Sequence, residues 1–582
     1  MKKKFITSAV IIVTFIALVY SQSAAPSFMI EFLTLGVNPI DLKSANLLDE
    51  VNAIQLEGIS ADQNVAAGMY EIASAIEWFE PDPEHIRATE NALGVRIAVD
   101  PRTQITFGQK QFGWRESRMQ LSNEDPILRR YLKRHEKTLD QLLSILERPV
   151  FANFYYSPDQ ERENLLWKVL RCLTHTSKEY AGALQIRARI ALIEDRMADA
   201  IADVGAIQKL GHRLIHDGGT LTEVFKGIAI NTMASETWCE ILSHPEISLE
   251  NLKMISHSVK TYPPTYNTKS LDVYERLMVL QATQSMERFG AVGTGRIFEN
   301  KKLINPEDTI LPTLAMTFTN WPDIYKAVNR HLDAHVEVLL IEDQAQRRAA
   351  IKVLDSDGGR LEFHEEKPIG RSLANRSVWY LLNELILWEQ ATYLRQLELA
   401  RQENEILNLC IALKRFNLEH RRYPDSLDEL IVEQSSWDLF LKLRSDGEYL
   451  DRIPVDFGTG LAVGYIPLEA GCVVYTSGRN EQDNRGWGYR NLSTSYGTYY
   501  DDVTYVIGKD DRPAPEGMKK PLPLIPGRII GYPKDWDEKN LSLAGEQVSQ
   551  AEFENVCHIE ELRWLDLSLT DLPEDWIKQF RV

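Results

Sequence analysis

Apolar residues recur at intervals of three and four between about residues 44 and 370, and this periodicity is the strongest constraint on the fold. One such stripe runs from Leu128 to Leu143, and another runs from Leu166 to Leu173. Side chains at this spacing share one face of an α-helix. We therefore expect residues 44–370 to form a helical domain, either a bundle or a solenoid.

The segment from Ala183 to Ile215 predicts two antiparallel helices that approach closely, because it is rich in alanine, and Asp217-Gly-Gly219 fits a helix stop. This pair is similar to the helix pairs of tetratricopeptide proteins. A period of about 34 residues cannot be aligned through it, so a repeat array and an irregular bundle both stay open. A further helix is expected from Trp321 to Leu354, and Arg376 to His420 predicts one long helix.

The N-terminus carries an export pattern. Three lysines, from Lys2 to Lys4, precede an apolar run from Phe5 to Tyr20, and small residues follow as far as Ala25. The run is at the short end of a membrane span, which needs roughly 17 to 25 residues. Residues 1–25 are therefore expected to be a signal peptide or an N-terminal membrane anchor, and the remaining chain is expected on the periplasmic side of a bacterial cell envelope.

Charge and cysteine content exclude some classes of function. The formal net charge is −19, which disfavours a general role on nucleic acid or on an anionic membrane surface. The five cysteines are scattered and include no C-x-x-C, so neither a disulfide framework nor a zinc ribbon is indicated. We expect Cys172, Cys239 and Cys410 to be ordinary core residues, because they lie among apolar helical residues.

The region after Ala412 has a distinct order of elements. A helical run ends before Tyr423-Pro424, a short helix is expected from Asp425 to Leu430, and a small Asp/Asn-rich sheet follows. This order resembles the globular domain of the major, G-like pseudopilins of type II secretion systems, over about residues 405–507. The chain lacks the peptidase site with which a pseudopilin begins, so assembly into a pilus is not expected. Residues 371–507 are thus expected to be a long helix plus a pseudopilin-like α+β domain.

The resemblance also implies a calcium loop. Pseudopilins hold Ca²⁺ in an Asp/Gly-rich loop with a closing acidic pair, and carboxylate and carbonyl oxygens are the ligands that this ion prefers. Glu481 and Arg485 stand where the family usually has glycine, and a turn closed by its own Asx hydrogen bonds is the alternative. The residues that match the loop are Asn480, Asp483, Asn484, Asp501 and Asp502.

The C-terminal residues predict a repeat. A proline-rich linker is expected over residues 508–535, and two segments within 536–582 then align at an offset of 24, with Leu541 matching Leu565. Residues 562–572 fit the leucine-rich-repeat pattern. This leucine-rich-repeat-like tail is too short to be stable alone, so we expect it to dock on another surface. A plain amphipathic helix is the alternative.

Catalytic motifs are missing from the sequence, which contains no H-E-x-x-H, G-x-S-x-G or P-loop. His212 and His216, like His331 and His335, have the four-residue spacing of two metal ligands on a helix, but we interpret both as surface pairs. The expected function is a binding or scaffolding protein of the envelope with protein partners. The alternative is an envelope hydrolase, which a pocket with clustered, pKa-shifted groups in the helical body would favour.

Overall fold

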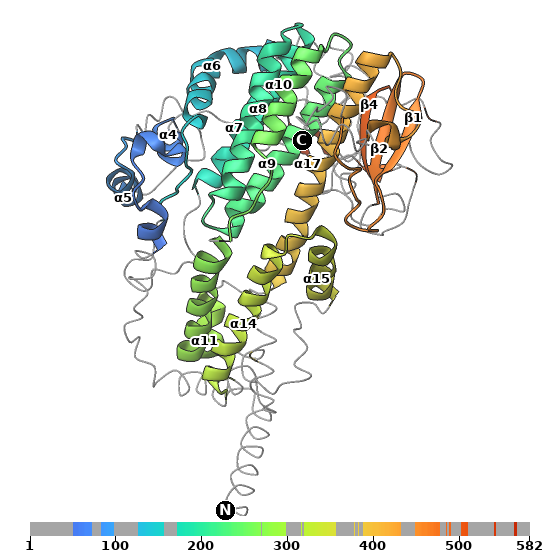
Figure 1. Cartoon of the computed structure of the whole chain (residues 1–582). Helices are drawn as coiled ribbons and strands as arrows, with labels where there is room; N and C mark the ends of the chain where they lie inside the picture. The colour runs from blue at the N-terminus through green and yellow to red at the C-terminus, as the bar shows by residue number, and fades with distance from the viewer. Residues whose placement is uncertain are drawn as a thin grey trace, which may run out of the picture.

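The computed structural model describes residues 51–72, 83–97, 126–155, 172–268, 270–297, 316, 319–356, 378, 382, 388–431, 449–477, 485, 488–489, 502–509, 512, 540–542 and 564–566. Within these residues the protein is mainly helical, and a small sheet lies on the right-hand side of the helices in the view of Figure 1.

The described residues of the N-terminal half are mainly helical, as the periodicity predicts. Residues 51–56 are helical, and a short 3₁₀ helix, η1 (Ala61–Gln63), follows them. The α-helices that follow in the described part are α4 (Val65–Ile72), α5 (Pro83–Leu93), α6 (Pro126–Leu146), α7 (Cys172–Ile193), α8 (Met197–His216), α9 (Leu221–Ser243) and α10 (Leu249–Thr261).

Helices α7 and α8 form the predicted hairpin. The chain reverses at Asp195, which has a φ of 57° and so provides the left-handed residue with which many helices end. Helix α9 then packs closely on α8. A Cβ atom at Gly227 would lie 2.8 Å from the carbonyl oxygen of Gly211, so the two backbones meet where neither helix carries a side chain.

The next helices lie below the bundle of α7 to α10 in the view of Figure 1. They are the π-helix η4 (Ser270–Glu275), α11 (Arg276–Ile297), α14 (Trp321–Leu340) and α15 (Gln344–Ser356). The prediction of one helix from Trp321 to Leu354 is wrong, because the chain turns between α14 and α15. Asp343 caps α15 there, since its Oδ1 accepts from Gln346 N at 2.7 Å.

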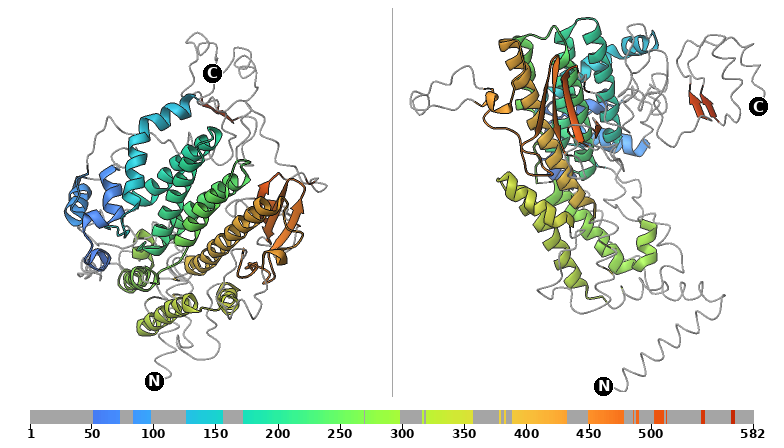
Figure 2. Two further views of the ribbon diagram at one scale, coloured as in Figure 1. Left: turned by 45° about the horizontal axis from the view of Figure 1, so that its top comes forward. Right: turned by 90° about the vertical axis from the view of Figure 1, so that its right-hand side faces the viewer.

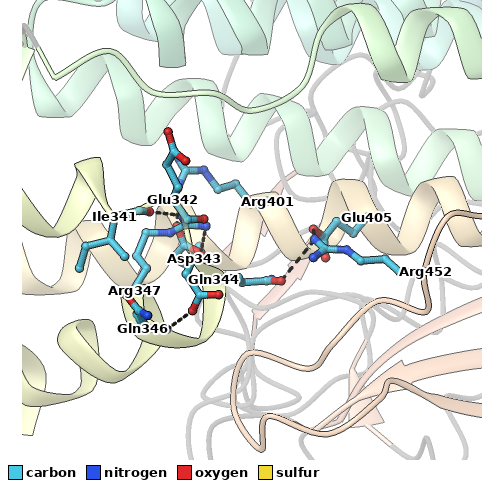
Figure 3. A network of polar contacts seen from close by, with 10 residues as sticks. Ile341, Glu342, Asp343, Gln344, Gln346, Arg347, Arg401, Glu405 and Arg452 are labelled. Atoms are coloured by element: carbon cyan, nitrogen blue, oxygen red, sulfur yellow. Dashed lines mark hydrogen bonds and ion pairs between the residues drawn. The ribbon is translucent and has the colours of Figure 1, made fainter.

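A polar network holds this turn against α17 (Trp388–His420), as Figure 3 shows. The Arg347 guanidinium donates to Ile341 O at 2.6 Å and to Glu398 Oε1 at 2.7 Å. It thereby satisfies a carbonyl at the end of α14 and bonds a carboxylate of α17. The predicted long helix from Arg376 to His420 is helical wherever it is described, including at Val378 and Leu382.

The α+β unit follows α17 in the order that the sequence predicts. Tyr423-Pro424 leads to η6 (Leu427–Leu430), a short 3₁₀ helix, and then to a sheet of order β1-β2-β4-β3. Its strands β1, β2 and β4 are antiparallel, and β3 runs parallel to β4. The bounds are β1 (Gly464–Leu468), β2 (Gly471–Thr476), β3 (Gly488–Tyr489) and β4 (Asp502–Gly508).

The sheet packs across α17 and the C-terminal end of α9, so it shares the main hydrophobic core with the helical body (Figure 2). Buried Val474 and Ile507 belong to the same cluster as Leu409 and Leu413 of α17. Ser243, at the end of α9, accepts a hydrogen bond from Gly508 N at 3.0 Å.

Two short strands belong to the C-terminal tail, and they pair in parallel. These are β5 (Asn540–Ser542) and β6 (Trp564–Asp566), with Leu541 opposite Leu565. Each residue of β5 thus pairs with the residue of β6 that lies 24 positions later, which is the offset found in the sequence. Because both segments are strands, they do not form one continuous helix. The leucine-rich repeat itself stays a prediction, because the residues that connect the strands lie outside the described part.

The N-terminal prediction also lies outside the described residues, which begin at Val51. Among the residues that the structure describes, no helix is both long enough and apolar enough to span a membrane.

Candidate functional site

A cavity of about 200 Å³ lies where α8 ends and α9 begins. For comparison, an engineered apolar cavity of roughly 150 Å³ takes up benzene, whereas sites for drug-sized ligands start near about 300 Å³. The volume therefore suits a group about the size of one aromatic ring. Its walls combine apolar and polar residues from four segments: Val51, Ile54, Gln55 and Ile59; Val150, Phe151 and Ala152; Asp217, Gly218 and Gly219; and Asn267, Val273 and Tyr274.

The two glycines of the predicted helix stop form one wall, and both positions require glycine. A Cβ atom at Gly218 would lie 2.3 Å from Leu214 O, and one at Gly219 would lie 2.3 Å from Tyr155 Oη. The chain can therefore turn from α8 into α9 beside the cavity only without side chains here.

Buried carboxylates cap the N-terminus of α9 beside this wall. Thr220 and Glu223 form a reciprocal capping box, and Glu223 Oε2 accepts from Gly219 N at 2.9 Å and Thr220 N at 3.1 Å. Glu275, the last residue of the π-helix, accepts from Leu221 N at 2.9 Å. Because these carboxylates already take up the positive end of the helix dipole, the helix end does not offer an anion site.

Glu223 also holds the segment after α6, which contributes Val150, Phe151 and Ala152 to the cavity. Its Oε2 accepts from the Tyr155 hydroxyl at 2.7 Å, and its Oε1 accepts from Asn153 Nδ2 at 2.7 Å. Burial, reinforced by the Glu223 charge, raises the pKa of Tyr155 well above its ordinary value, so the phenol stays protonated. Its ring packs against Tyr274 at a centroid distance of 5.2 Å.

Two buried asparagines hold the extended segment after α6. Asn52 donates to Tyr155 O at 2.9 Å and accepts from Tyr155 N at 2.8 Å. Asn64 makes the same pair of bonds to Ala152, at 2.7 and 3.0 Å. The backbone N–H and C=O groups of Ala152 and Tyr155 therefore all have protein partners. Because these bonds fix the segment that forms this wall, the cavity is pre-formed.

Asp217 is the carboxylate that lines the cavity, and its oxygens are already engaged. Its Oδ2 accepts from Phe151 N at 3.2 Å and from Arg213 at 3.3 Å, and its Oδ1 contacts His216 Nδ1 at 2.7 Å. This hydrogen bond raises the pKa of His216. The neighbouring His212 instead bonds Pro263 O at 2.6 Å, and burial lowers its pKa.

The interpretation of the second histidine pair as a surface pair is wrong. His331 and His335 are fully buried, with ring centroids 4.3 Å apart, and His335 Nδ1 contacts His331 O at 2.7 Å. They lie on the same face of α14 as Ile324 and Val328, so the spacing of four marks the core side of this helix. Burial lowers the pKa of both.

The predicted calcium residues fall largely outside the described part of the chain. This holds for Asn480, Asp483, Asn484 and Asp501, whereas Asp502 begins β4 and pairs with Gly488 of β3. Within the ranges that the structure describes, no three His, Cys, Asp or Glu side chains are grouped to hold a metal ion. Calcium binding therefore rests on the resemblance alone.

Sequence reasoning missed the residues that build the cavity. The pattern Thr220-x-x-Glu223 is a recognisable capping box and could have identified the start of α9. Asn52 and Tyr155 carry no such local signal, since their contact joins positions 103 residues apart.

A comparison with protein families, curated proteins and solved structures finds no match to this chain.

Proposed function

We propose that the chain is a binding protein of the bacterial envelope, and that its cavity between α8, α9 and η4 takes a small, neutral, largely apolar ligand. The observation that carries this proposal is a pre-formed cavity of about 200 Å³ whose carboxylate already has protein partners. Apolar walls with a few polar groups are typical of ligand sites.

The charges around the cavity favour a neutral ligand. Arg213 and His216 surround Asp217, and Glu223 and Glu275 cap the end of α9. An ionised ligand would lose its hydration on entering the cavity, and the charged side chains named above already bind other groups of the protein. Val51, Ile59 and Phe151 offer apolar contact instead, and Gln55 and Asn267 supply polar groups.

The envelope location rests on the lysines and apolar run of residues 1–25. A reporter enzyme fused after Val582 should be active only if it matures outside the cytoplasm, and activity inside the cytoplasm would contradict export. A scaffolding role towards protein partners and a Ca²⁺ loop at 480–502 belong to the same proposal, and both rest on the resemblance of the sequence to pseudopilins.

One observation favours the alternative of a hydrolase. His216 is oriented by a carboxylate at 2.7 Å and has a raised pKa, as a general base often has. However, the same carboxylate also binds Arg213 and Phe151 N, and His216 is not among the residues that line the cavity. Binding is therefore the better-supported function.

Calorimetric titration of the full chain with indole tests the proposal, because indole is neutral, aromatic and has one N–H donor. Wild-type protein should bind indole saturably, and Val150→Trp, which fills the cavity, should weaken binding at least tenfold. The matched control is Val353→Trp on α15, where the side chain is 60% exposed and indole binding should be unchanged.

Two further results separate the alternatives. His216→Gln should retain indole binding, and wild-type protein should not hydrolyse p-nitrophenyl acetate above the rate of this variant. Turnover that His216→Gln abolishes would favour the hydrolase. Equal indole affinity in wild type and Val150→Trp, or no saturable binding at all, would refute the cavity as a ligand site.

A further inference from the structure

Three cysteines that are far apart in the sequence meet where the sheet joins the helical body. Cys239 comes from α9, Cys410 from α17 and Cys472 from β2, and all three are free thiols. Cys410 is a core residue, as expected, Cys472 belongs to the same hydrophobic core, and Cys239 packs against it. Cys239 and Cys472 both lie close enough to Cys410 to contribute to its raised pKa.

The register of the two helices explains why Cys239 and Cys410 face each other. The Thr232 hydroxyl of α9 donates to Glu403 Oε2 of α17 at 2.9 Å, and these residues are 171 positions apart. Cys239 and Cys410 are separated by the same number of positions, and each lies seven residues beyond that hydrogen bond. Two parallel helices keep such a pairing, because seven residues span almost two full turns, or about 10 Å of rise.

The surroundings of the pair hold this register in place. Ser243, one turn beyond Cys239, is fixed to β4 by the hydrogen bond from Gly508 N. Leu409 and Leu413 of α17 are fully buried on either side of Cys410. The two sulfurs are thus held near each other by packed elements and not by a mobile loop.

The two thiols differ in access. Cys239 is partly exposed, whereas Cys410 and Cys472 are fully buried. The hydrogen bond with Cys239, together with burial, raises the pKa of Cys410 well above that of an ordinary thiol. Because only Cys239 of the two is open to solvent, an oxidant reaches Cys239 first, and Cys410 reacts afterwards from within the protein.

We infer that Cys239 and Cys410 form a disulfide bond in the exported protein, by exchange with a disulfide oxidant. The Cys239 thiolate attacks one sulfur of the oxidant, forms a mixed disulfide and releases the first oxidant thiol. Cys410 then loses its proton, attacks Cys239 Sγ and releases the second oxidant thiol. The two cysteines lose two protons and two electrons, and the oxidant disulfide becomes two thiols.

The bond would join two parts of the molecule. Helix α9 belongs to the helical body, and α17 leads directly into the α+β unit, so the disulfide fastens the sheet to the bundle. Cys472 should keep its thiol in this arrangement, because it extends from β2, whereas the register of α9 on α17 pairs Cys239 with Cys410.

Peptide mapping of the full chain tests the inference. Protein treated with oxidised glutathione is denatured, alkylated with iodoacetamide and digested with trypsin without reduction. The three cysteines fall in separate peptides, residues 227–253, 402–414 and 453–479. We expect 227–253 linked to 402–414 in most molecules, and 453–479 alkylated.

Matched Cys→Ser variants supply the controls. Cys472→Ser should keep the cross-link, and Cys239→Ser should lose it. A reductant should lower the melting temperature of the oxidised wild type by several degrees but leave that of Cys239→Ser unchanged. The inference is overturned if 227–253 carries only glutathione while 402–414 is alkylated, or if the cross-link joins any other pair of cysteines.

Discussion

Glu403 of α17 should make the protein less stable as the pH rises from 5 to 8. Its carboxyl group is buried between α9 and β4, where Thr232 donates to it at 2.9 Å. The pKa of Glu403 is raised to about 8, chiefly by burial and also by the nearby Glu236 charge, and hydrogen bonds from Thr232 and Tyr505 only partly oppose this. Near neutral pH the folded protein therefore holds this side chain mainly protonated.

The direction of the effect follows from proton binding. The folded pKa of about 8 lies above the ordinary value of 4.5, so the folded state binds the proton more tightly than the unfolded state. The contribution of Glu403 to stability is complete below about pH 4.5 and is lost as the pH rises through 8. Because each tenfold difference in proton affinity is worth about 1.4 kcal/mol, the loss over this window is on the order of 3 to 5 kcal/mol.

Urea unfolding between pH 5 and pH 8 measures this loss. Glu403→Gln imitates the protonated carboxyl group and cannot ionise. Between pH 5 and pH 8 its free energy of unfolding should therefore decrease by about 3 kcal/mol less than that of the wild type. At pH 8 the variant should be the more stable of the two.

Glu398→Gln is the matched control, since it removes a second buried carboxylate from the same helix. Glu398 accepts from Arg347 at 2.7 Å and from Arg401 at 2.5 Å, so its replacement removes the negative charge that both guanidinium groups share. We expect destabilisation of about 3 to 5 kcal/mol at every pH tested. Parallel pH profiles for wild type and Glu403→Gln would refute the assigned role of Glu403.

Three further predictions concern other parts of the chain. Gly227→Leu should lower the melting temperature, because overpacking the α8 contact costs about 1 to 3 kcal/mol, whereas Gly205→Ala, whose Cβ would lie 3.4 Å from Ser258 Oγ, should not; equal melting temperatures would contradict the close packing. If the loop proposed by resemblance binds calcium, Ca²⁺ should raise the melting temperature of the wild type and not that of Asp483→Ala, since a ligand that binds only the folded state stabilises it; an identical response would leave the Asx turn as the explanation. Leu567→Asp should make the tail more sensitive to limited proteolysis, because a charge in a small core costs several kcal/mol; unchanged resistance would exclude the repeat.

Local patterns in the sequence determined the helical character of the protein and several of its boundaries. The stripe from Leu128 to Leu143 lies in α6, and the alanine-rich segment forms the hairpin of α7 and α8. Asp217-Gly-Gly219 separates α8 from α9, as predicted. These features are readable because helix periodicity and helix stops depend on residues only a few positions apart.

Tertiary structure alone decided which residues meet. The four-residue spacing of His331 and His335 is the same on an exposed face and on a buried one, and only the packing of α14 places them in the core. The cavity depends on contacts such as that of Asn52 with Tyr155, and the thiol pair depends on the parallel register of α9 and α17. Such contacts join residues 103 and 171 positions apart in the sequence. No local pattern around one residue specifies which distant residue it will contact, because that is decided by how whole helices pack against each other.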